Sequence, residues 1–139
     1  MNKLFNFFGI CLIIITLSSC SNVKETTITS AGKPAQLDIR LSTDNSIRVT
    51  LKPLSYEGNY PKTPVLVEMD SPVPVISLQT MHETVEAKMG NLKVKVNLNP
   101  LIINVTNSSG ELVQELTFLD NGDLSFNRDQ SPILGLGEG

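Results

Sequence analysis

Few side chains of this protein have the chemistry of a catalytic or metal site. His82 is the only histidine among the 139 residues, and a general base needs a partner within hydrogen-bonding reach. Its neighbour Glu83 is expected on the opposite face of a strand, so His82 is interpreted as an exposed strand residue. Asp120 and Asp123 flank an Asn-Gly pair, and their oxygens are of the kind that calcium binds. The loop alone is too short to supply the roughly six to eight oxygens that calcium takes, so both are interpreted as turn residues.

Two other features concern ligand binding. Gly135 and Gly137 have glycine spacing that suggests a phosphate loop, but the lysine and helix of that mechanism are missing. Tyr56 and Tyr60 lie in a proline-bearing loop at residues 53–64. Aromatic faces bury the CH groups of sugar rings, so both tyrosines are candidate sugar contacts, with ordinary loop packing as the alternative. The sequence predicts no catalytic residue, no metal site and no cofactor.

Strands must position these side chains. Apolar and polar residues alternate in short segments, most clearly at 92–98, where Leu92, Val94 and Val96 share one face. Successive strand residues point to opposite faces, whereas helix residues two apart cannot share a face. The predicted strands are 37–41, 47–52, 65–70, 75–79, 82–89, 92–98, 101–105, 111–119 and 124–127.

Turn residues separate these strands. The clearest turn is the Asn-Gly pair at 121–122, because Asn-Gly readily adopts the positive φ angles of tight hairpins. Residues 43–46, 90–91 and 107–110 have similar composition. Short strands with turns every 8–12 residues or so are typical of sandwiches. The sequence therefore predicts an all-β fold, an antiparallel β-sandwich over residues 35–139.

The start of the chain has a different composition. Lys3 is followed by a nearly unbroken apolar run at residues 4–17. This run is shorter than the roughly 20 residues that span a bilayer, which favours a cleaved secretory signal over a transmembrane helix. Cys11 lies within the run, so the domain that remains after cleavage would have no disulfide.

The end of the apolar run carries a second signal. Residues 17–20, LSSC, resemble a bacterial lipobox. The resemblance implies a lipoprotein signal peptide at residues 1–19, a diacylglycerol on Cys20, and a tether at residues 20–34. Two acyl chains anchor a protein far better than one. We therefore expect a bacterial cell-envelope protein held on a lipid bilayer, periplasmic or surface-exposed; an ordinary signal peptide is the alternative.

The charge of the chain argues against one class of partner. The net charge is −3, and it becomes −4 when residues 1–19 are removed, because they contain Lys3 and no acidic residue. Nucleic-acid binding requires a clustered basic face. We therefore expect no nucleic-acid partner.

Several segments occur in an order that resembles a known family. A strand, a proline break and a second strand fill residues 92–105, a hairpin turn follows at 109–113, and the stretch GLGE stands at 135–138. Residues 47–53 are similar to an early strand of the same domain. This order resembles the N-terminal domain of glycoside hydrolase family 31, which includes many α-glucosidases and α-xylosidases. The resemblance covers most of residues 37–139.

The resemblance implies a supersandwich like that of galactose mutarotase, packed against a (β/α)₈ barrel. Family members hydrolyse terminal α-linked sugars with retention, using two carboxyl groups roughly 5–5.5 Å apart. Both lie on the barrel, which these 139 residues do not include, so no catalytic residue is transferred to this chain. We expect an accessory domain that is inactive alone and exposes an apolar face. Its expected partners are the barrel and, through it, an α-linked oligosaccharide.

Two other functions remain open. A free-standing surface lipoprotein could bind glycans or envelope partners, and such a protein would need a lipid anchor without catalysis. A structural envelope lipoprotein with no ligand is the third hypothesis.

Overall fold

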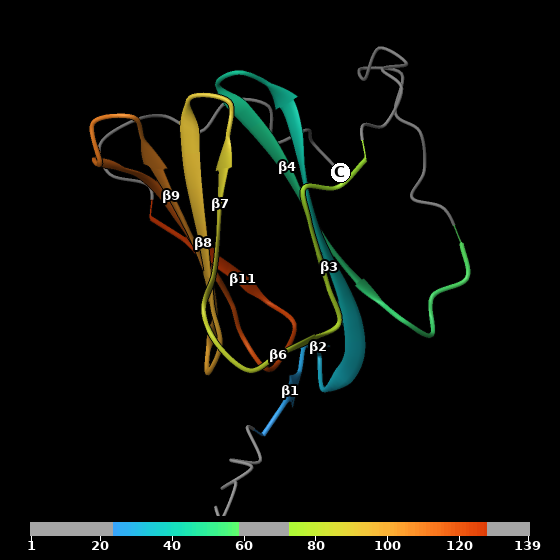
Figure 1. The fold of residues 1–139 in the computed structure, drawn as a ribbon. Coiled ribbons are helices and arrows are strands. Elements are labelled where there is room, and N and C mark those ends of the chain that lie inside the picture. The colour runs from blue at the N-terminus through green and yellow to red at the C-terminus, as the bar shows by residue number, and fades with distance from the viewer. Residues whose placement is uncertain (1–23, 59–72, 128–139) are drawn as a thin grey trace, which may run out of the picture.

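The computed structural model describes residues 24–58 and 73–127 (Figure 1). All regular elements in this part of the chain are β-strands, and all of their pairings are antiparallel. They are β1 (Thr26–Thr27), β2 (Thr29–Ser30), β3 (Lys33–Thr43), β4 (Ser46–Pro53), β5 (Ile76–Leu78), β6 (Thr80–Met81), β7 (Val85–Met89), β8 (Leu92–Asn97), β9 (Leu101–Asn107), β10 (Leu112–Phe118) and β11 (Leu124–Phe126). The predicted fold class is confirmed: the chain forms an antiparallel β-sandwich.

One layer is a five-stranded sheet in the order β11-β10-β9-β8-β7. Each strand pairs with the next in sequence, because the connecting turns are too short to allow another order. The alternation in β8 decides which side faces inward: Leu92, Val94 and Val96 are buried, while Lys93 and Lys95 are exposed. The clearest alternating segment of the sequence therefore has the two faces that its pattern predicts.

The other layer is built around β3. On one side β3 pairs with β4 over nearly its whole length. On the other side it pairs first with β2 and then, at Leu37 to Ile39, with β5. A small two-stranded sheet of β1 and β6 adjoins this layer at Ile28, whose amide donates to the carbonyl of Gln79.

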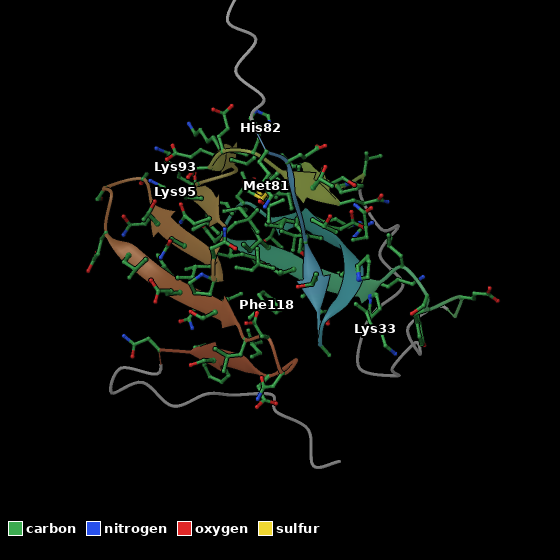
Figure 2. The ribbon with its side chains drawn as sticks, turned by 90° about the horizontal axis from the view of Figure 1, so that it is seen from below. Lys33, Met81, His82, Lys93, Lys95 and Phe118 are labelled. Atoms are coloured by element: carbon green, nitrogen blue, oxygen red, sulfur yellow. The ribbon has the colours of Figure 1, made fainter. Side chains whose placement is uncertain are left out.

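The core lies between β3 and the strands β7, β8 and β9. Leu37, Ile39, Val94, Val96 and Ile103 have no exposed surface. Full burial of a side chain of this size contributes about 1.5–3 kcal/mol. Met81 completes the core from β6 and lies between the two layers (Figure 2).

The folded region begins before residue 35. Strands β1 and β2 lie within residues 20–34, the range interpreted from its position as a tether. Ile28, between these strands, is fully buried in the core. A single apolar residue among polar ones has no periodicity to reveal it, so the sequence did not indicate that this segment joins the sheets.

Two hairpin turns join the layers at one end. The amide of Asn91, in the turn between β7 and β8, donates to the carbonyl of Asp44, in the turn between β3 and β4, at 2.7 Å. The Asn91 side chain donates to Oδ1 of Asn45 at 2.9 Å. Gly90 has φ of +61°, and a Cβ there would lie 2.5 Å from the Asp44 carbonyl oxygen. This close approach requires glycine.

Two local expectations differ from the structure. Strand β7 begins at Val85, so the predicted strand at 82–89 starts three residues too early. In the turn after β10 only Gly122 has positive φ, +94°, while the side chain of Asn121 accepts a bond from the Asp123 amide. Such a single left-handed glycine is typical of a three-residue hairpin loop rather than a two-residue Asn-Gly turn. The predicted strand at 65–70 lies outside the described residues.

Candidate functional site

His82 does not occupy the position that the sequence suggested. It lies in a bend before β7, and its Nε2 is 3.5 Å from Oε1 of Glu83. The expectation that Glu83 points to the opposite face of a strand was wrong, because no strand includes these residues. Both side chains are more than half exposed, so this contact is a surface pair, which contributes little.

Asp120 and Asp123 lie in the hairpin loop between β10 and β11. The carboxylate of Asp123 accepts a hydrogen bond of 2.6 Å from the Asn121 side chain. In residues 24–58 and 73–127, no three His, Cys, Asp or Glu side chains are grouped so that they could hold a metal ion.

Tyr56 is the sugar-contact candidate that the structure describes. It follows β4, its side chain is exposed, and its ring centroid lies 5.3 Å from Nζ of Lys52. A cation at this distance from an aromatic ring is attracted to it. The remaining residues singled out in the sequence, Tyr60, Cys20, Gly135 and Gly137, lie outside the described residues. None of the described segments is a helix of the length and hydropathy that a membrane crossing needs.

A connected set of polar side chains covers the outside of the β3 layer. We call it the outer polar face, and its members are Gln36, Asp38, Arg40, Ser77 and Gln79. Gln79 donates to Oε1 of Gln36 at 2.8 Å, and Gln36 donates to Oγ of Ser77 at 2.9 Å. Ser77 donates to Oδ1 of Asp38 at 2.8 Å, and Arg40 donates to Oδ2 at 3.0 Å. Strand pairing of β3 with β5 therefore places five polar groups in one hydrogen-bonded chain.

The charge of Asp38 is stabilised within this chain. Partial burial raises the pKa of the carboxyl group, but the hydrogen bond from Ser77, the hydrogen bond and charge of Arg40, and the bond from Gln36 together outweigh it. The pKa of Asp38 is therefore lowered below its usual value of 3.8. The carboxylate stays ionised and acts only as an acceptor of hydrogen bonds.

The outside of the five-stranded sheet has a different character. Glu86 of β7 forms ion pairs with Lys93 at 2.6 Å and Lys95 at 3.5 Å. The hydrogen bond and charge of Lys93, followed by the weaker effect of Lys95, lower the pKa of Glu86 although desolvation opposes them. An open depression of about 490 Å³ lies beside this pair, between the turns that follow β7 and β9. These exposed charges are typical of a solvated sheet surface.

Apolar side chains are exposed at the other edge of the five-stranded sheet. Strand β10 has no fully buried residue, and all of β11 is exposed. Leu124 and Phe126 are paired with Phe118 and Leu116, which pack against the core. They are therefore on the inward side of the sheet, yet they are 46% and 39% exposed. We call these four residues the β10–β11 apolar surface. Strand β11 is at the edge of the sheet, and among the described strands it pairs only with β10.

Sequence reasoning missed the outer polar face. The alternation of Gln36, Asp38 and Arg40 with apolar neighbours indicated their outward direction. Their bonding to Ser77 and Gln79 depends on pairing between segments 39 to 43 residues apart, which no local pattern reveals. In the described residues the chain is an all-β sandwich that carries a hydrogen-bonded polar face on one sheet and exposed apolar side chains at Leu124 and Phe126 on the other. Comparison with family models, curated proteins and solved structures finds no match for this chain.

Proposed function

We propose that this chain is the accessory β-sandwich domain of a protein that hydrolyses α-glycosidic bonds, of the kind found in glycoside hydrolase family 31. In this function the sandwich packs against a catalytic barrel domain, which supplies both catalytic carboxyl groups and binds the α-linked oligosaccharide. The chain itself stays inactive. Attachment through a lipidated Cys20 to a bacterial cell envelope is part of the same proposal.

The β10–β11 apolar surface is the observation that carries this proposal. Leu124 and Phe126 are two of the nine large apolar side chains exposed in the described residues, and they adjoin the partly buried Leu116 and Phe118. Apolar side chains gathered on one surface mark sites of protein interaction. The order of strand, proline break, strand and turn in residues 92–110 adds support from the family resemblance.

Co-expression with a catalytic barrel of this family that lacks its own sandwich tests the proposal. We expect the barrel to co-purify with the full chain and to hydrolyse an aryl α-glucoside. Leu124→Asp combined with Phe126→Asp should abolish co-purification, because each places a charge in the apolar surface. Ser125→Asp combined with Thr117→Asp is the matched control: it adds two charges to the paired strands on the opposite face, and co-purification should persist.

Two results would contradict the proposal. Hydrolysis of an aryl α-glycoside by the chain without a barrel would show that the catalytic residues lie within these 139 residues. Equal co-purification of the Leu124→Asp, Phe126→Asp variant and the Thr117→Asp, Ser125→Asp control would exclude the apolar surface as the contact.

The nucleotide sequence beyond codon 139 offers a simpler test. We expect a reading frame that continues into a barrel domain.

A further inference from the structure

We infer that the outer polar face, with Lys52 and Tyr56 beside it, is a binding surface for an oligosaccharide chain. All of these residues belong to this chain, so the inference does not require a catalytic barrel. The side chains lie in rows that run from β5 and the residue after it, across β3, to β4. One row holds Gln79, Gln36 and Lys52, and the next holds Ser77, Asp38 and Thr50.

The spacing of these rows suits a chain of sugar rings. Neighbouring strands lie about 4.8 Å apart, which is similar to the length of one pyranose unit along an oligosaccharide. A chain lying across the strands therefore meets a new polar side chain at each successive sugar. Each sugar hydroxyl both donates and accepts hydrogen bonds, and the row through Gln36 offers amides, which also do both.

The polar groups are held in position before any ligand arrives. Gln36 contacts Ser77 and Gln79, and Asp38 is held by Ser77 and Arg40 from two sides. Binding to side chains that are already ordered loses less conformational entropy than binding to mobile ones. An ordered surface of this kind can therefore bind sugar hydroxyl groups in competition with water.

Tyr56 supplies the aromatic component. Its ring lies next to Lys52, which pairs with Gln36 in the sheet, so the ring stands at the end of one polar row. Within the described part of the chain, the exposed aromatic side chains are Tyr56 and Phe126, and Phe126 belongs to the β10–β11 apolar surface. The outside of the five-stranded sheet has polar side chains without such a ring. Among the described residues, only the outer polar face therefore has both ordered polar side chains and an exposed aromatic ring beside them.

Other classes of ligand fit this surface less well. A peptide is usually held in an apolar groove or by backbone pairing with an open strand edge, whereas the groups named here are polar side chains on the outward face of β3 and of its neighbours β4 and β5. A nucleic acid requires a clustered basic face; Arg48 and Lys52 lie on this face, but Arg40 is paired with Asp38 and the net charge of the chain is −3.

The test is a binding titration of the full chain, purified in a detergent without a sugar headgroup. The probes are maltoheptaose, a neutral chain, and trigalacturonic acid, an acidic one. We expect saturable binding of one of them by calorimetry. Amide resonances of residues 36–40, 50–52 and 77–79 should shift in NMR spectra. Tyr56→Ala and Gln79→Ala should each weaken binding about tenfold, a loss of about 1.4 kcal/mol.

Lys95→Ala is the control, because Lys95 is exposed on the outside of the other sheet. Its affinity should match that of the unchanged protein. Binding of neither probe, or binding that Tyr56→Ala and Gln79→Ala leave unchanged, would overturn the inference. Neither result would affect co-purification with a barrel through Leu124 and Phe126, so the two proposals fail separately.

Discussion

Replacing Gly90 with alanine should destabilise the sandwich more than the same change at any exposed turn glycine. Gly90 has φ of +61°, and a Cβ added to this residue would lie 2.5 Å from the Asp44 carbonyl oxygen. A left-handed conformation costs an alanine about 1–2 kcal/mol. The new methyl group must also displace the Asp44 backbone, which weakens the 2.7 Å bond from the Asn91 amide. Loss of such a bond costs about 0.5–1.5 kcal/mol, so the expected total is about 1.5–3.5 kcal/mol.

Gly110→Ala is the matched control for this prediction. Gly110 also lies in a hairpin turn and has φ of +83°, but nothing lies within 4 Å of its added Cβ. Its substitution should therefore cost only the conformational part, about 1–2 kcal/mol. The difference between the two variants measures the contact between the two hairpin turns.

Urea unfolding of both variants, followed by circular dichroism, gives the two free energies by linear extrapolation. The melting temperature offers an independent readout, since 1 kcal/mol corresponds to roughly 4–8 °C in a domain of 60–100 residues. Equal losses for Gly90→Ala and Gly110→Ala would refute the reasoning, because the turn of β7–β8 would then not be held against Asp44.

Three other predictions concern the core and the two outer faces. Ile28→Ala should cost about 2–5 kcal/mol, as for other buried isoleucines, and a loss below about 0.5 kcal/mol in urea unfolding would mean that residue 28 is not part of the core. Because the pKa of Asp38 is lowered on folding, its contribution to stability is present above the usual value of 3.8 and is lost as the pH falls through the folded-state pKa. The unfolding free energy should therefore fall more steeply in acid than that of Asp38→Asn; parallel curves would contradict this. Lys93→Met should raise the pKa of Glu86, measured by NMR titration, and an unchanged pKa would exclude Lys93 as the main cause.

The candidate surfaces were only partly predictable. Tyr56 was singled out because an aromatic residue in a polar loop is informative by type alone. The outer polar face was not recognised, since Gln36 and Asp38 are ordinary outward residues of β3 until β5 brings Ser77 and Gln79 beside them. The exposure of Leu124 and Phe126 could not be read from their strand pattern, because it followed from the burial of their neighbours in the structure alone.

Local patterns determined the class of the fold. A repeat of two along residues 92–98 allows only a strand with Leu92, Val94 and Val96 on one face, because successive side chains point in opposite directions. Turn residues between such strands favour hairpins, so antiparallel neighbours in the five-stranded sheet could be expected from the sequence.

Tertiary structure decided what lies next to what. The pairing of Leu37 with Leu78, the burial of Ile28 and the contact of Asn91 with Asp44 each join segments far apart in the chain. Closing such loops costs entropy that only the completed core can offset. Contacts of this kind depend on how the two sheets pack together, so no single segment of the sequence contains them.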